Sequence, residues 1–179
     1  MKLTIMNGCC IDNMLQHELR EFYKEKRTDS VDWINLDNIK YCRGCDYCQT
    51  INPGLCAIQD GQNEVLQRYM NSDKVIIITP VIFGCCNSRV KNFIDRTEPL
   101  FLPFQVLKDG ESIMKGRYEK YPELTFIAVC EDKNIDAAEN FKKFIYSCNL
   151  SLVSHRVIVK IILHSVKITD IEDLMLLEE

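Results

Sequence analysis

The stretch Val75-Ile-Ile-Ile-Thr-Pro-Val-Ile-Phe-Gly84 lies near the middle of the chain. Its first four residues are continuously apolar and β-branched, which is typical of a strand buried on both faces of a parallel sheet. Pro80 and Gly84 interrupt the residues that follow, so we expect the strand to give way to a loop there. The stretch therefore predicts a central strand with a turn at its carboxyl end.

Short apolar runs alternate with segments of helical periodicity on both sides of this strand. Because strands that alternate with helices form open parallel sheets, the pattern predicts an α/β fold with five parallel strands. The expected strands are 3–6, 31–36, 75–78, 124–129 and 157–163. The expected helices are 15–23, a helix capped by Asp60 that carries Val65, Leu66 and Tyr69, a helix through 90–94, and helices at 137–148 and 171–177.

These elements predict a three-layer, doubly wound sheet with strand order 2-1-3-4-5, in a single domain spanning residues 1–179. In such a sheet the ligand binds at the carboxyl ends of the strands, where the strand order reverses. That point lies between the first and third strands, so we expect Gly8, Pro80 and Cys130 in one crevice. The segment 101–121 contains Pro103, Gly110 and Gly116, and we expect it to be irregular.

The overall composition limits which partners and which cellular compartment we expect for this chain. The 179 residues carry 22 basic and 26 acidic side chains, a net charge of −4, which gives no reason to expect nucleic acid as a partner. No stretch is apolar over the length of a membrane span, and the start MKLTIMNGCC does not resemble a signal peptide. We therefore expect a cytoplasmic chain whose ten cysteines stay reduced.

Four of these cysteines lie close together, with the spacing C-x2-C-x2-C-x7-C. Such a run is typical of iron–sulfur ligands, whereas zinc sites more often use two C-x2-C pairs that are well separated. The spacing favours an iron–sulfur centre over zinc, and a metal-free cysteine-rich loop remains the third alternative. The candidate metal ligands are Cys42, Cys45, Cys48 and Cys56.

Two segments together resemble a known family. Thr79-Pro-Val-Ile-Phe-Gly84, followed by Lys91-Asn-Phe-Ile-Asp-Arg-Thr97, is similar to the third-strand segment of the NADPH-dependent FMN reductase-like flavoproteins. These proteins have a flavodoxin-like fold, and the group includes the iron–sulfur flavoproteins. The run from Cys42 to Asp60 is similar to the second-strand loop of the same group.

The resemblance implies an FMN-dependent oxidoreductase or electron-transfer protein, with NAD(P)H as a donor and a small molecule or a protein as the electron partner. It also implies a homodimer or homotetramer, and a [4Fe–4S] cluster held by the four cysteines. No catalytic side chain is required, because FMN supplies the redox chemistry and backbone N–H groups of the 80–84 loop could face the ring. The FMN-contacting residues that the resemblance implies are Gly8, Cys9, Cys10, Asp12, Asn13, Thr79, Pro80, Val81, Ile82, Phe83, Gly84, Cys130 and Glu131.

The first loop departs from the family pattern. Relatives hold the FMN phosphate there with hydroxyls and an arginine, whereas no Arg, Lys, Ser or Thr lies between Gly8 and Leu19. A helix N-terminus would still attract the phosphate, but the carboxylate of Asp12 opposes it. We therefore expect FMN to bind more weakly than in relatives. The alternative is a flavodoxin-like protein that has lost FMN and acts as a metal-binding or thiol-based redox module.

Further cysteines follow the first, third and fourth predicted strands. Because those strands are neighbours, we expect the five thiols to gather near the flavin site. These cysteines could serve only as small buried side chains in the core. The alternative is a functional thiol or a second metal site. The residues are Cys9, Cys10, Cys85, Cys86 and Cys130.

Overall fold

The computed structural model describes residues 1–9, 17, 21, 31–108, 110–130 and 135–163. The helix expected at 171–177 lies outside the described residues, and so does the helix expected at 15–23 except for residues 17 and 21. Among the described helices, none is long and apolar enough to cross a membrane.

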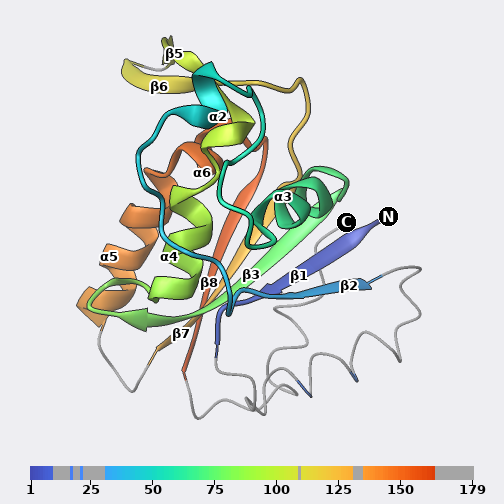
Figure 1. Cartoon of the computed structure of the whole chain (residues 1–179). Helices are drawn as coiled ribbons and strands as arrows, with labels where there is room; N and C mark the ends of the chain where they lie inside the picture. The colour runs from blue at the N-terminus through green and yellow to red at the C-terminus, as the bar shows by residue number, and fades with distance from the viewer. Residues whose placement is uncertain (10–16, 18–20, 22–30, 109, 131–134, 164–179) are drawn as a thin grey trace.

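The core of the molecule is a parallel sheet (Figure 1). Its strands are β1 (Leu3–Asn7), β2 (Val31–Asn35), β3 (Lys74–Ile82), β7 (Glu123–Cys130) and β8 (Val157–Leu163). They pair in the order β2-β1-β3-β7-β8, and each neighbouring pair is parallel. This order confirms the predicted 2-1-3-4-5 arrangement and puts the reversal of strand order between β1 and β3.

Three helices cover one face of the sheet. They are α3 (Gln62–Met70), α4 (Ser88–Asp95) and α5 (Ile135–Tyr146), and their apolar side chains share one core cluster with alternate residues of the strands. The intervening strand residues form a second cluster on the opposite face, because successive side chains of a strand point to opposite sides. The shorter helices are α2 (Tyr47–Thr50), the 3-10 turn η1 (Glu98–Leu100) and α6 (Asn149–Val153).

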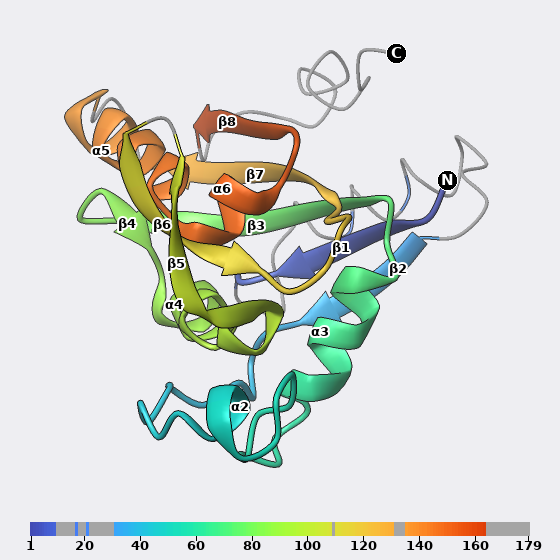
Figure 2. The same ribbon diagram turned by 90° about the horizontal axis from the view of Figure 1, so that it is seen from above.

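The segment after η1 is a β-hairpin, so the prediction of an irregular excursion over 101–121 is wrong. β5 (Phe101–Lys108) pairs antiparallel with β6 (Glu111–Gly116), apart from the main sheet. The residues taken as breakers have places in the hairpin. Pro103 lies where the register shifts between Phe101 and Gln105, and Gly110 has a φ of 85° between the strands. The hairpin lies beside α6, with which β6 is in contact (Figure 2).

The start of α3 also differs from the prediction. Gly61, with a φ of 90°, is the N-cap, and Asp60 lies one residue earlier. The Asp60 carboxylate does accept from the Gln62 backbone N–H at 3.3 Å, but its other oxygen pairs with the Arg96 guanidinium. Asp60 therefore joins α3 to the end of α4 rather than capping one helix.

β3 runs past Pro80 to Ile82 and turns back into β4 (Cys85–Cys86). Phe83 and Gly84 form the two-residue turn, with φ values of 50° and 75°. Two central residues that both have positive φ are typical of a type I′ hairpin turn. The expected loop at 80–84 is thus a strand end followed by a tight turn.

The end of β1 lies unusually close to α4. Gly8 donates its backbone N–H to the Ile78 carbonyl at 2.9 Å, and its own carbonyl accepts from the Asn87 side chain at 2.6 Å. A Cβ at Gly8 would overlap Val90 Cγ2 and approach the Ile78 oxygen to 2.9 Å. Position 8 therefore needs glycine, because Val90 and Ile78 leave no room for a side chain.

We predict that Gly8→Ala lowers the free energy of unfolding by about 1–3 kcal/mol, the usual effect of overfilling a packed site. Val90→Ala removes the first atom that the new methyl meets. The double variant should therefore lose less stability than the sum of the two single variants. Urea unfolding of the four proteins measures this cycle, and strictly additive losses would contradict the described contact.

Candidate functional site

Several residues predicted to contact FMN lie at the carboxyl ends of β1, β3 and β7, an edge of the sheet that we call the flavin edge. Thr79 and Pro80 pair with Ala128 and Val129, one residue before Cys130, and Gly8 bonds directly to Ile78. This register places Gly8, Pro80 and Cys130 at the same edge of the sheet, and their meeting in one crevice stays a prediction. Four of the residues assigned to FMN lie outside the described residues: Cys10, Asp12, Asn13 and Glu131.

The turn after β3 presents apolar surface at this edge. Ile82 is 46% exposed, and Phe83 is fully exposed although its φ of 50° is unfavourable for a residue with a side chain. The turn is held in place because Gly84 packs against α5, where a Cβ would come within 2.9 Å of Asn140 Cβ. Val81 is partly buried against the core. An aromatic and an aliphatic side chain are thus available to a planar apolar ligand.

The first turn of α4 holds the start of the first loop. Asn87 caps α4 through Val90 N at 3.2 Å and also binds the Gly8 carbonyl. Arg89 donates from Nη1 to the Cys9 carbonyl at 2.9 Å, and its Nε lies 3.1 Å from Asp37 Oδ1. The sequence reading missed Arg89, because it looked for phosphate-binding cations inside the loop and not 80 residues later.

The four described thiols that we expected to gather near the flavin site, Cys9, Cys85, Cys86 and Cys130, do not form one group, and Cys10 lies outside the described residues. Cys9 belongs to the cluster on one face of the sheet and Cys86 to the cluster on the other. Cys85 and Cys86 lie instead near Cys148, whose thiol donates to the Phe144 carbonyl at 3.2 Å. Burial raises the pKa of the Cys86 thiol, and the neighbouring Cys85 raises it further. Cys86 is therefore a poor nucleophile.

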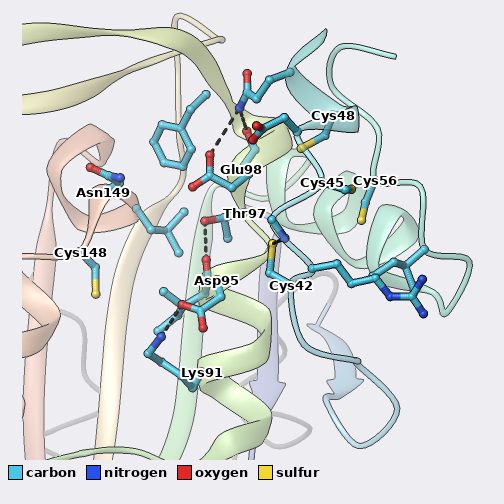
Figure 3. Close-up of a pocket in the computed structure, with 18 of the residues that line it drawn as sticks. Cys42, Cys45, Cys48, Cys56, Lys91, Asp95, Thr97, Glu98, Cys148 and Asn149 are labelled. Atoms are coloured by element: carbon cyan, nitrogen blue, oxygen red, sulfur yellow. Dashed lines mark hydrogen bonds and ion pairs between the residues drawn. The ribbon is translucent and has the colours of Figure 1, made fainter. Parts of the chain in front are cut away.

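The four-cysteine motif lines a cavity of about 600 Å³ beside α4. Figure 3 shows Cys42, Cys45, Cys48 and Cys56 on the segment between β2 and α3, with Cys48 in α2 and with Cys148 farther off beyond Lys91 and Asp95 of α4. The remaining walls include side chains of η1, β5, α5 and α6: Glu98, Phe101, Phe144, Asn149 and Leu150. All four predicted ligands thus share one cavity.

The four sulfurs are not arranged as a complete ligand set. No group of three His, Cys, Asp or Glu side chains among the described residues has a geometry that could hold a metal ion. Two N–H donors nevertheless point at the sulfurs, from the Gly44 backbone to Cys42 at 3.5 Å and from Arg96 Nη2 to Cys56 at 3.2 Å. Four thiols with such donors suit a soft metal centre that carries negative charge. The chemical type of these residues therefore fits an iron–sulfur cluster.

The cavity also disfavours charge on some of its own groups. Burial raises the pKa of Cys48 to about 11, with further contributions from Cys56 and Glu98. Burial likewise raises the pKa of Glu98, against a hydrogen bond from Gln49. A cation or a metal centre would reverse this effect, because it stabilises a thiolate.

A family model described as NADPH-dependent FMN reductase matches residues 1–117. Among curated proteins, an iron–sulfur flavoprotein of Methanocaldococcus jannaschii is 35% identical over 76 residues, which cover 42% of this chain and 38% of that protein. An iron–sulfur flavoprotein of Archaeoglobus fulgidus is 41% identical over 59 residues, covering 33% of this chain and 28% of that protein. The matched regions thus span about a third of the length of these relatives.

Two solved structures are similar in fold. The NAD(P)H:quinone oxidoreductase of Methanothermobacter marburgensis superposes with a TM-score of 0.64 at 12% identity, over 93% of this chain and 86% of that chain. An FMN-dependent NADH-azoreductase of Bacillus anthracis, solved in complex with FMN, gives a TM-score of 0.62 at 14% identity, over 96% and 92%. At these identities the comparison supports the flavodoxin-like fold alone.

We predict a strong difference in alkylation among the cavity thiols of the metal-free protein. Cys42 and Cys45 are exposed, whereas at pH 8 only about one Cys48 in a thousand is a thiolate, given its pKa of about 11. Iodoacetamide labelling followed by peptide mass spectrometry should therefore find Cys42 and Cys45 modified first. Labelling of Cys48 should accelerate as the pH rises towards 11. Equal rates for Cys48 and Cys42 at pH 8 would contradict this assignment.

Proposed function

The chain belongs to the NADPH-dependent FMN reductase family, and on this basis we propose that it is an FMN-dependent oxidoreductase or electron-transfer protein that uses NAD(P)H as donor. The observation that carries the proposal is the edge between β1 and β3, where Gly8 meets Ile78 at the reversal of strand order. Bound FMN would supply the hydride and single-electron chemistry, and the protein would supply binding and orientation.

The described residues at this edge suit FMN. Ile82 and Phe83 offer exposed apolar surface for the ring, and Arg89 offers a guanidinium beside the first loop. A guanidinium is well suited to bind phosphate because its N–H groups form a planar fork. We propose that Arg89 supplies part of the phosphate recognition that the first loop itself lacks. Its ion pair with Asp37 would then orient the guanidinium and offset part of its charge.

We further propose that Cys42, Cys45, Cys48 and Cys56 hold a [4Fe–4S] cluster. The support is the spacing of the cysteines, the cavity that all four line, and the N–H donors to two of the sulfurs. The cluster would relay single electrons. The protein would surround the cluster with N–H donors. It would also limit the access of water, because Cys48 and Cys56 are half-buried.

We propose a homodimer or homotetramer in a reducing compartment such as the cytoplasm, where free thiols persist. The hairpin supports self-association, because Phe104, Val106 and Leu107 are exposed on β5. The electron partner would be a small molecule or another protein.

The proposed activity is tested by mixing anaerobic, FMN-loaded protein with NADPH and following the visible spectrum. We expect the flavin absorption to bleach and to return when an electron acceptor is added. Protein that holds iron but no flavin, even in excess FMN, would instead identify the alternative, a flavodoxin-like redox module that has lost FMN.

We predict that Arg89→Gln weakens FMN about tenfold or more and leaves riboflavin binding unchanged, because riboflavin lacks the phosphate. Arg68→Gln is the matched control. Arg68 is also 32% exposed and paired with an aspartate, Asp32, but it lies near the opposite end of β1 and β2. Fluorescence titration gives the dissociation constants of FMN and riboflavin for each variant and for the unmodified protein. Equal loss of affinity for FMN and for riboflavin in Arg89→Gln would exclude a role of Arg89 in phosphate binding.

We predict that Cys45→Ser removes most of the bound iron from protein purified without oxygen, because a hydroxyl is a poor ligand for a soft centre. Cys148→Ser should retain the iron of the unmodified protein. Cys148 is the matched control because it lines the same cavity without belonging to the motif. Iron and sulfide assays measure the result, and equal iron content in the two variants would argue against the assigned ligands.

A further inference from the structure

Arg96, the residue that follows α4, is the largest charged group in the core of the described structure. Its side chain is completely buried and forms an ion pair with Asp60. Nη1 also donates to the Lys40 carbonyl at 3.1 Å, and Nη2 donates to the Ile58 carbonyl at 3.3 Å. The same Nη2 lies 3.2 Å from the sulfur of Cys56.

These contacts close the base of the cysteine loop. Lys40 precedes the first cysteine of the motif, and Ile58 and Asp60 follow the last one, so the guanidinium binds both ends of the loop. Asp60 adds a second link, because it accepts from the Lys40 backbone N–H at 2.8 Å. Burial raises the pKa of the Asp60 carboxyl, but hydrogen bonds from Arg96, Lys40 and Gln62 outweigh it and hold the pKa below its usual range. The pair is therefore ionised in the folded protein.

A salt bridge to Asp60 does not by itself explain the contact with Cys56. Nη1 carries the ion pair with Asp60, whereas Nη2 donates to the Cys56 sulfur and the Ile58 carbonyl. A buried cation next to a sulfur stabilises negative charge on that sulfur. Hydrogen bonds and positive charge near a cluster also favour its reduced, more negative form.

We propose that Arg96 is a positioning residue of the four-cysteine site: it fixes the Cys56 sulfur and raises the reduction potential of the cluster. This inference rests on the proposed [4Fe–4S] cluster. It adds that the ligands are not equivalent, since Cys56 alone among the four is held by a buried cation from α4. The family match gives no role to this arginine.

The test compares Arg96→Lys and Asp60→Asn in anaerobically purified, cluster-loaded protein. Lysine keeps the positive charge opposite Asp60, but its single ammonium lacks the fork that reaches both Asp60 and Cys56. We expect Arg96→Lys to shift the potential of the cluster to a more negative value. A tenfold change in the ratio of reduced to oxidised centre corresponds to about 59 mV for one electron.

Asp60→Asn should shift the potential in the opposite direction. It removes a nearby negative charge and leaves Arg96 on Cys56. Both variants should lower the melting temperature, because each disturbs a buried ion pair. Arg117→Lys is the control, since Arg117 binds the Pro99 and Phe101 carbonyls without touching a sulfur. We expect this variant to leave the potential unchanged.

The possible outcomes separate the two hypotheses. Opposite shifts in the two variants, with iron content retained, support the role of Arg96. If both variants lose stability and keep the potential of the unmodified protein, Arg96 is purely structural and the inference is overturned. If Arg96→Lys does not fold, Asp60→Asn alone decides, and the absence of a positive shift overturns the inference. Unmodified protein that binds no iron would overturn the proposed cluster itself and the inference with it.

Discussion

The close approach of β1 to α4 is the constraint on which the candidate flavin edge depends. Gly8 is bonded on one side to Ile78 of β3 and on the other to Asn87, and Val90 fills the space where its side chain would be. Asn87 must therefore cap α4 and bind the first loop at the same time. One asparagine thus fixes the start of the helix relative to the end of β1.

Helix α4 connects the two candidate sites. Its first turn binds the first loop through Asn87 and Arg89, and Arg96 just beyond its end binds the cysteine loop. The eight residues of α4 span about 12 Å at 1.5 Å per residue. Because Val90 and Phe93 are fully buried, the helix is fixed against the sheet. The distance between the flavin edge and the four cysteines is therefore set by one short, well-packed element.

The sheet could be predicted from the sequence because its signals are local. β-branched runs such as Val75–Ile78 are strong strand formers, and the order 2-1-3-4-5 is one of the few that the crossover rules allow for a doubly wound sheet. The hairpin β5–β6 is hard to predict because Pro103 and Gly110 usually interrupt strands, whereas here they occupy a register shift and a turn. Asp60 was assigned to a helix cap because its partner Arg96 is distant in sequence.

The contacts that organise the sites could not be predicted for a related reason. Arg89 reaches the Cys9 carbonyl across 80 residues, and Arg96 reaches Cys56 across 40. A cysteine motif specifies which side chains are available, but not which cation lies behind them. Likewise, cysteines that follow neighbouring strands predict one group, yet Cys9 and Cys86 pack into core clusters on opposite faces of the sheet.

The cysteine loop is anchored unequally, and this bears on how a metal centre would form. The backbone of Cys56 exchanges two hydrogen bonds with the Asn63 side chain, at 2.8 and 2.9 Å, and its sulfur is held by Arg96. Cys42 and Cys45 are exposed, and Cys42 has a local bond from Gly44. Moving an exposed thiol breaks few contacts, whereas moving Cys56 would break a buried network. Cys56 would therefore be the fixed ligand of a bound cluster, and the exposed thiols of Cys42 and Cys45 could adjust their positions at the lowest cost.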